Sequence, residues 1–364
     1  MRVLQVTTHV NIGGISHYIL SLSKAMKAKG VYVMVASSGG VLENAFSDRG
    51  IPHKKLNLKT KFEFAPKVLM SALKLARLVR DENIDVIHAH TRVSQVASVI
   101  ASRLTGVAYV TTCHGFFKKR ARGIFDTWGD KVIAISDAVK EHLVCDLGVK
   151  DERIEVIYNG VDIDHFTADC TAGEIENAKR GLGLKKGPII GTIGRLSSVK
   201  GQKFLIHAMA EVISKCPDAQ AVIIGDGNED VPLKNLAGSL GISNSVHFLH
   251  SVPDTHSCLS VMDIFVFPSV KEGLGIALLE AMASGKACVT SDAGGIRNAI
   301  EDGVTGLLTP VGNSDAISRA ILKLIENNDM RKTLGSNARS LAIKKFSLDD
   351  MAGKMIGLYE GVAA

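Results

Sequence analysis

Two glutamates on either side of a glycine-rich turn are the residues in this chain best suited to chemistry. The segment 271–295 reads KEGLGIALLEAMASGKACVTSDAGG and holds Glu272 and Glu280. The glycines permit a tight turn and close approach of a ligand to the backbone. The apolar run after them predicts a helix over residues 276–284, whose first amide hydrogens favour anions, phosphates above all. Carboxylates at both ends would accept hydrogen bonds from hydroxyls, which suits a nucleotide sugar.

Other predicted strand ends carry groups that handle charge. The segment GTIGRLSSVKG contains Arg195 and Lys200, and paired cations neutralise a departing diphosphate without a metal. His114 follows a strand in TTCHG, where a neutral imidazole would bind a sugar hydroxyl and a protonated one would assist a departing phosphate. His88 and His90 have metal-like spacing, but the sequence shows no third ligand near them. We expect supporting or structural roles for these two histidines and no metal site.

Two glycine-containing loops follow predicted strands and precede helices. Gly13 and Gly14 open a helix after the first strand, and Gly225 and Gly227 lie in IIGDGNED. Neither loop is a G-x-G-x-x-G fingerprint, so dinucleotide binding of the usual kind is not predicted. A glycine pair at such a place lets a ligand reach the backbone and the start of the helix, although a merely structural turn would also explain it.

The order of predicted elements indicates parallel sheets. A length of 364 residues with 46% hydrophobic residues suits two domains with separate cores. Strands alternate with helices in both halves, as in a doubly wound α/β fold. We expect strands at 3–7, 32–37, 86–88, 109–112, 131–135, 189–193, 221–224, 246–248, 264–267 and 287–291. We expect helices at 14–29, 66–81, 93–104, 137–144 and 349–360.

Composition narrows the classes of function. The net charge is +6, with a balance of +7 in residues 1–165 and −1 in the remainder. The basic excess attracts anionic lipid or nucleic acid without distinguishing them, but no nucleic-acid-binding motif accompanies it. No run of 18 apolar residues indicates a membrane span. The six cysteines form no C-x-x-C pair and predict neither zinc nor disulfides, so we expect a cytoplasmic protein.

Basic residues gather in two places in the first half. One cluster comprises Lys54, Lys55, Lys59 and Lys61, and the other spans residues 118–122. Solvated surface explains both clusters as well as an anionic partner does. The stretch 62–80 mixes apolar and basic residues and suits either an interface-seeking amphipathic face or ordinary core packing.

These motifs together resemble the retaining glycosyltransferases of family 4. The resemblance rests on the Glu272–x7–Glu280 pattern with E-G-L-G, on G-R-x-x-x-x-K-G around Arg195 and on N-G-V-D at residues 159–162. It covers nearly the whole chain and is strongest from residue 191 to residue 310. One departure is Gly275, where many relatives have proline or another small residue.

The resemblance implies a GT-B fold, in which two Rossmann-like, doubly wound α/β domains face each other across a cleft. We expect an acceptor-binding domain at 1–165, completed by a C-terminal helix at 348–364 that crosses back onto it. Residues 166–347 would form the nucleotide-sugar-binding domain. The last helix of the family ends on the first domain, which is why 348–364 is assigned there.

The resemblance also implies roles for matching positions. Glu280 would hold the ribose hydroxyls, Glu272 would bind a hydroxyl of the sugar, and the acceptor would attack with the leaving phosphate as its base. The implied catalytic residues are Glu272, His114, Arg195 and Lys200. The implied donor-binding residues are Gly13, Gly14, Gly225, Gly273, Leu274, Gly275 and Glu280. Neither a metal nor another cofactor is implied.

The function expected from this resemblance is a retaining, hexosyltransferase-type enzyme that uses a UDP- or GDP-sugar. The segment CHGFFKKRAR favours cell-envelope and lipopolysaccharide members, with a glycan or lipid-linked acceptor and peripheral contact with anionic membrane at its inner face. Alternatives are a non-catalytic nucleotide-sugar-binding protein and a nucleotide-sugar epimerase on the same fold. A nucleic-acid partner is not expected, because only the basic charge speaks for it.

Overall fold

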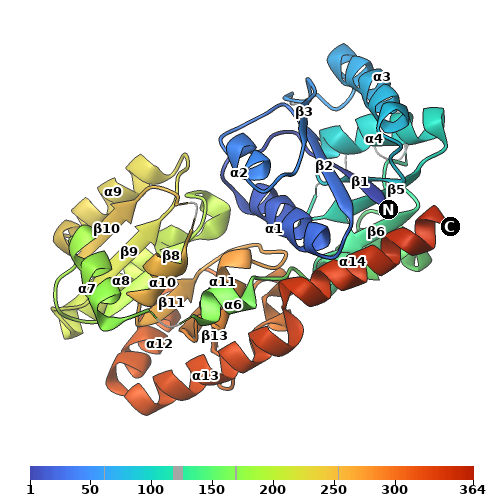
Figure 1. Ribbon diagram of the computed structural model, residues 1–364. Coiled ribbons are helices and arrows are strands. Elements are labelled where there is room, and N and C mark those ends of the chain that lie inside the picture. The colour runs from blue at the N-terminus through green and yellow to red at the C-terminus, as the bar shows by residue number, and fades with distance from the viewer. Residues whose placement is uncertain (61, 118–125, 169, 253) are drawn as a thin grey trace. The chain divides into compact units, whose positions relative to one another are not determined.

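The chain forms two compact units that it enters and leaves in turn. The computed structural model describes residues 1–60, 62–117, 126–168, 170–252 and 254–364. Lys61 and the basic cluster at 118–122 lie outside the described residues. The N-terminal unit comprises Met1–Gly160 and Leu348–Ala364, and the C-terminal unit comprises Val161–Ser347 (Figure 1). The first crossing therefore falls five residues before the boundary expected at 165.

The N-terminal unit is built on a parallel sheet of seven strands in the order β3-β2-β1-β4-β5-β6-β7. Strands β1 and β4 pair side by side, with β2 on the other side of β1. The strand order therefore reverses at β1, which makes the carboxyl ends of β1 and β4 the place where ligands of such sheets bind. The strands are β1 (Arg2–Val6), β2 (Tyr32–Ser37), β3 (His53–Lys55), β4 (Val86–Ala89), β5 (Ala108–Cys113), β6 (Lys131–Ala134) and β7 (Ile154–Val156).

Helices pack on this sheet because each buries an apolar face. In α3, Val68, Ala72, Leu75 and Val79 recur at helical spacing and are buried in a core with strand residues such as Leu4. The last helix, drawn in red, belongs to this unit and packs on α1 (Figure 1). The helices are α1 (Gly14–Ala28), α2 (Glu43–Ser47), α3 (Pro66–Asp81), α4 (Arg92–Thr105), α5 (Asp137–Cys145) and α14 (Leu348–Ala363).

The C-terminal unit repeats the design with six parallel strands in the order β10-β9-β8-β11-β12-β13. Here β8 has β9 on one side and β11 on the other, so the strand order reverses at β8. Each strand is buried on both faces and reads as a short apolar run, as parallel strands do. The strands are β8 (Ile189–Ile193), β9 (Gln220–Ile224), β10 (Val246–Leu249), β11 (Ile264–Phe267), β12 (Ala287–Ser291) and β13 (Leu307–Thr309).

The helices of this unit enclose a second core around Leu205, Ile223 and Val266. Among the described residues, no helix is both long and apolar enough to cross a membrane. The helices are α6 (Ile163–Thr167), α7 (Ala172–Gly181), α8 (Gln202–Lys215), α9 (Asp230–Ser239), α10 (His256–Ser260), α11 (Ile276–Ala283), α12 (Ser314–Glu326) and α13 (Asn328–Lys345).

The way helices begin differs between structural and candidate-site positions. Side-chain oxygens of Ser136, Thr171, Asn313 and Asn327 cap α5, α7, α12 and α13, which satisfies amide donors at those ends. By contrast, α1, α8 and α11 begin at glycines and have no side-chain cap. These three helices follow β1, β8 and β11, so their first amides are left to a ligand or to water at the strand ends.

Candidate functional site

Three neighbouring strands of the C-terminal unit bring most of the predicted residues to one edge of its sheet. Arg195 and Lys200 follow β8, Gly225 follows β9, and Glu272 follows β11. These strands lie in the order β9-β8-β11 and run parallel, so their carboxyl ends are adjacent. The predicted charged residues therefore meet where the strand order reverses, the usual ligand position of an open α/β sheet.

The loops at this edge touch each other through their backbones. A Cβ atom added at Gly225 would lie 2.0 Å from the carbonyl oxygen of Gly194, and one added at Gly227 would lie 2.0 Å from that of Leu196. At Gly201, φ is +69° and a Cβ atom would lie 2.0 Å from the Pro268 carbonyl oxygen. Only glycine fits such contacts. The G-D-G and K-G elements therefore fix the spacing of the loops rather than merely allowing turns.

Lys200 and Glu272 form an ion pair across 72 positions of sequence. Lys200 Nζ lies 2.5 Å from Glu272 Oε2, and Ser269 donates a hydrogen bond to the same oxygen at 3.3 Å. The side chains are 25% and 11% exposed, so solvent screens the pair only partly. Lys200 Nζ also lies 5.3 Å from the centre of the Phe267 ring. The two predicted catalytic charges are held together before any ligand binds.

Arg195 presents a second cation at the same strand end. Its residue is exposed, and its backbone carbonyl accepts a hydrogen bond from Gln202 Nε2 at 3.0 Å. The backbone of the loop is thus anchored to the start of α8. Among the described residues, no carboxylate forms an ion pair with the guanidinium. An arginine in this state is available to a phosphate group.

The turn between Glu272 and α11 offers backbone rather than side chains. Leu274 is 2% exposed, so its side chain lies in the core. Gly275 has φ −73°, and a Cβ atom there would lie 2.5 Å from the ring of Phe267. The Phe267 ring occupies the space that a side chain at position 275 needs, which explains why this chain has glycine there. Gly273 is buried in the same turn.

Glu280 lies in the second turn of α11 and has one hydrogen-bond donor. Thr255 Oγ1 donates to Glu280 Oε2 at 2.8 Å. Burial raises the pKa of Glu280 to about 7, the Thr255 bond opposes that rise, and the charge of Asp254 adds to it. A carboxylate in this position has remaining lone pairs for two further hydroxyl donors, as the role of ribose binder requires.

His114 and the glycines of the first loop lie in the N-terminal unit. Gly13 and Gly14 are exposed at the start of α1, with nothing within 4 Å of a Cβ atom added at either. His114 follows β5, and its Nε2 lies 3.1 Å from His90 Nδ1. Burial lowers the pKa of His114 to about 3. The imidazole is therefore neutral at pH 7, which supports hydroxyl binding and not proton donation to a phosphate.

The structure adds partners that the sequence did not reveal. The absence of a third histidine near His88 and His90 was wrong in space, because β5 pairs with β4 and brings His114 beside His90. The contact is a hydrogen bond between two rings. Thr255 and Ser269 contact the two glutamates and were missed, since a lone hydroxyl residue in a loop has no distinguishing pattern.

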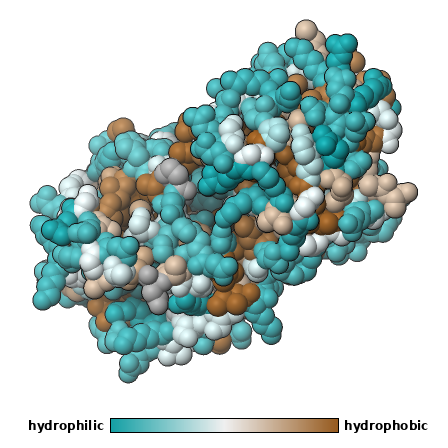
Figure 2. Space-filling model, in the orientation of Figure 1, coloured by the Kyte–Doolittle hydropathy of each residue, from teal (hydrophilic) through white to brown (hydrophobic). Residues whose placement is uncertain are grey.

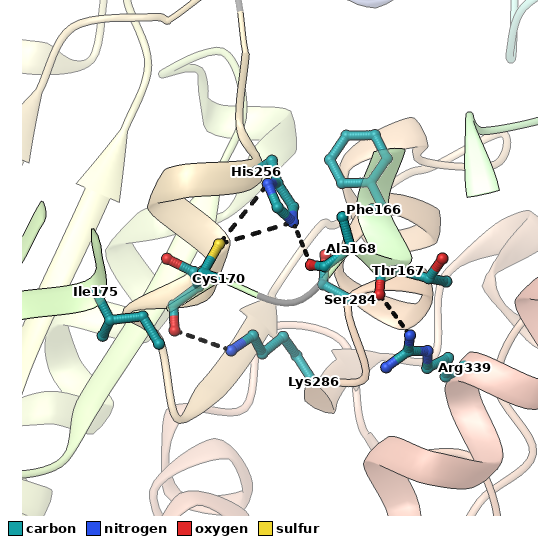
Figure 3. Close-up of a pocket in the computed structure, with 10 residues that line it drawn as sticks. Phe166, Thr167, Ala168, Cys170, Ile175, His256, Ser284, Lys286 and Arg339 are labelled. Atoms are coloured by element: carbon teal, nitrogen blue, oxygen red, sulfur yellow. Dashed lines mark hydrogen bonds between the residues drawn. The ribbon is translucent and has the colours of Figure 1, made fainter. Parts of the chain in front are cut away.

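A cavity of about 170 Å³ in the C-terminal unit lies away from these residues (Figure 3). Lys286 immediately precedes β12, so the cavity lies at the amino ends of the strands. Its polar groups have partners: Lys286 Nζ donates to the carbonyls of Ser260 and Met262, and Arg339 donates to that of Thr167. These bonds attach α6 and α13 to the sheet, which is a structural role.

Comparison with known proteins agrees with this geometry. Residues 12–165 match the model of Glycosyltransferase Family 4, and residues 174–341 match that of Glycosyl transferases group 1. The chain belongs to glycosyltransferase family 4. Members of this family are retaining hexosyltransferases, and the two matches correspond to the two units. The motif-based resemblance to this family is thus confirmed.

Relatives of this glycosyltransferase act on different acceptors. It is 27% identical to the UDP-Gal:alpha-D-GlcNAc-diphosphoundecaprenol alpha-1,3-galactosyltransferase of Escherichia coli, over 80% of this chain and 79% of that protein. It is 28% identical to the phosphatidyl-myo-inositol mannosyltransferase of Mycobacterium leprae, over 96% and 94%. Anabaena HepE in complex with UDP-glucose matches with a TM-score of 0.88 and 25% identity, covering 99% and 100%. The glycosyltransferase has the GT-B fold of these structures.

The raised pKa of Glu280 predicts a pH dependence of donor binding by the glycosyltransferase. The folded protein holds this proton up to about pH 7, whereas the unfolded carboxyl releases it near 4.5. The contribution of Glu280 to stability therefore falls as the pH rises from about 4.5 to about 7. Hydroxyl donors favour the ionised form, so affinity for UDP-glucose should rise about tenfold between pH 6 and pH 8.

Isothermal titration calorimetry across this range measures the effect. UDP-glucose suits the experiment because its diphosphate stays ionised throughout. Glu280→Gln keeps the shape of the side chain and removes the titration, so its affinity should be lower and flat with pH. A wild-type affinity that does not change between pH 6 and pH 8 would contradict the assignment of Glu280 to the ribose.

Proposed function

We propose that this glycosyltransferase moves a hexose from a UDP-sugar to a hydroxyl of a lipid-linked or glycan acceptor of the cell envelope. The observation that carries the proposal is the Lys200–Glu272 ion pair at the strand ends of the C-terminal unit. It sets a cation for a leaving diphosphate beside a carboxylate for a sugar hydroxyl. The uncapped start of α11 adds amide donors between these groups and Glu280.

Roles follow from these contacts. Glu280 holds the ribose, while Arg195 and Lys200 neutralise the charge that develops on the departing diphosphate. Glu272 accepts a hydroxyl of the transferred sugar and, through its bond to Lys200, fixes the ammonium. The amides of residues 273–275 donate to the phosphates. The acceptor hydroxyl attacks from the face that the diphosphate leaves and transfers its proton to that diphosphate, so the anomeric configuration is retained.

UDP is favoured over GDP by two relatives. The E. coli relative is named for UDP-Gal, and the Anabaena structure holds UDP-glucose. The same E. coli relative is named for an acceptor on diphosphoundecaprenol, and the mycobacterial one for phosphatidyl-myo-inositol. These names support a lipid-linked acceptor as the first class to assay. They leave the identity of the sugar to experiment.

A donor panel with two lysine variants tests the reaction. Wild type is incubated with UDP- and GDP-sugars and a lipid-linked acceptor, and the anomeric configuration of the product is read by NMR. Lys200→Ala should lower kcat about 100- to 1,000-fold, as loss of one charge-stabilising group does. Lys203→Ala is the matched control, because Lys203 is exposed one turn further on and contacts Phe204. Its kcat should stay within about twofold.

Other outcomes would change the proposal. Product of inverted configuration would contradict the attack on the leaving-group face. Binding of a UDP-sugar without transfer to any acceptor would favour the non-catalytic alternative. Equal losses in Lys200→Ala and Lys203→Ala would remove the special role of the ion pair with Glu272.

We further propose that the N-terminal unit docks on anionic membrane through α3 and the segment before it. Core packing accounts for one face of α3, but Phe62, Phe64, Leu69, Met70 and Leu73 are 48–77% exposed. Lys74 and Arg77 are exposed on the same helix. Brown apolar residues stand among teal ones where α3 lies in Figure 2. Exposed apolar groups beside cations suit an anionic bilayer surface, where a lipid-linked acceptor would be found.

Vesicle flotation tests the docking surface. Wild type should float with vesicles of phosphatidylcholine and phosphatidylglycerol and should bind pure phosphatidylcholine more weakly. The double variant Met70→Glu/Leu73→Glu should lose at least about tenfold in binding, since two apolar side chains no longer leave water. The control Val231→Glu/Ile343→Glu changes two similarly exposed residues of the C-terminal unit. Equal flotation of both double variants would contradict this surface.

A further inference from the structure

Five buried polar side chains form a chain of hydrogen bonds through the core of the N-terminal unit. They are Gln5 on β1, His88 on β4, His90 directly after β4, Thr112 on β5 and Tyr359 on α14, and each is 0% exposed. Buried polar groups are costly unless they are paired. A set of this size in the centre of a sheet therefore needs an explanation beyond packing.

The bonds run from the C-terminal helix to the sheet and onward to His114. Gln5 Nε2 donates to the Tyr359 hydroxyl at 3.3 Å, and Gln5 Oε1 lies 2.6 Å from His90 Nε2. His90 Nδ1 then lies 3.1 Å from His114 Nε2. On the other branch, the Tyr359 hydroxyl lies 2.6 Å from His88 Nδ1. The chain thus ends at a residue with a proposed role in the reaction.

The direction of each bond follows from the Gln5 amide. Its oxygen can only accept, so His90 Nε2 carries the hydrogen. Burial lowers the pKa of His90 well below its ordinary value, and the nearby His88 and His114 lower it further. A neutral imidazole has a single N–H, so His90 Nδ1 is a lone pair and accepts from His114 Nε2. His114, also neutral, is then left with a lone pair on Nδ1.

Tyr359 fixes the orientation of the amide. Its hydroxyl accepts from Gln5 and therefore has its own hydrogen to donate to His88 Nδ1. His88 Nε2 in turn carries a hydrogen and donates it to Thr112 at 2.7 Å. Reversing the Gln5 amide would reverse the His90 bond and put a hydrogen on His114 Nδ1. The helix α14 thus sets which face of His114 accepts.

We propose that Gln5 and His90 are positioning residues that hold His114 in its Nε2–H form, so that Nδ1 accepts a hydrogen bond from a hydroxyl of the sugar substrate. This inference rests on the proposed function for the identity of the substrate. Among the described residues, His114 Nδ1 has no hydrogen-bond partner. Residues behind a functional histidine commonly determine its tautomer in this way.

The tautomer can be measured without any substrate. Long-range ¹H–¹⁵N correlation spectra of the full-length protein with ¹⁵N-histidine distinguish the two neutral forms. At pH 7, His114 and His90 should both show a protonated Nε2 and a bare Nδ1, with signals assigned from His114→Gln and His88→Asn. A protonated Nδ1 on His114 would overturn the proposal, whatever the enzyme's activity proves to be.

Two substitutions at position 90 separate positioning from packing. In His90→Asn the amide oxygen can replace Nδ1 as the acceptor for His114, whereas in His90→Gln the amide replaces Nε2 and keeps only the Gln5 contact. His90→Gln should lower kcat/KM for the donor roughly ten- to a hundredfold, and His90→Asn should stay within about threefold. His88→Asn removes an equally buried ring that does not touch His114 and should leave kcat/KM near wild type.

Thermal melting of each variant separates these effects from unfolding. Equal losses of kcat/KM in His90→Asn and His90→Gln, with both folded, would overturn the positioning role. Absence of any sugar transfer by wild type would instead count against the proposed function, and the spectra would still decide the tautomer. A shift of His114 toward its Nδ1–H form in His90→Gln, but not in His90→Asn, would support the inference directly.

Discussion

The site depends on backbone contact between loops that leave adjacent parallel strands. Where Gly225 meets the Gly194 carbonyl and Gly201 meets that of Pro268, no side chain fits. This contact brings the loops after β8, β9 and β11 close enough for Lys200 to reach Glu272. A methyl group at either glycine would push the loops apart by more than an ion pair tolerates. The charges of the site therefore follow from glycines that carry no charge themselves.

The two units use buried polarity differently. In the C-terminal unit, the partly buried charges of Lys200, Glu272 and Glu280 lie at strand ends, where a donor would complete their hydrogen bonds. In the N-terminal unit, neutral groups are satisfied internally and continue to His114. Both arrangements let a ligand meet groups that are already oriented, so little reorganisation is needed when charge develops.

Much of the fold could be predicted from sequence because central parallel strands are continuous apolar runs. Strands such as β8 and β11 were predicted with their observed bounds. The strands β3, β7 and β13 were not expected, and each is a three-residue strand at the edge of its sheet. An edge strand pairs on one side only and needs no apolar run. Lys54 and Lys55, expected as a surface cluster, belong to the edge strand β3.

The candidate site shows the same division between local and distant signals. Glu272, Glu280, Arg195 and Lys200 were found because each stands in a local motif. The pairing of His90 with His114 was not, because it depends on the register of β4 against β5. The contribution of Tyr359 lies still further from sequence, since a tyrosine in an apolar helix is ordinarily a core residue. Only the packing of α14 on this unit places its hydroxyl beside Gln5.

A crystal structure of the protein with UDP-glucose tests the central claim most directly. The account predicts that the ribose hydroxyls bind Glu280 and that the diphosphate lies against Arg195, Lys200 and the amides of residues 273–275. It also predicts that Glu272 accepts a hydroxyl of the glucose. A donor bound elsewhere, such as in the cavity lined by Lys286 and Arg339, would contradict the account.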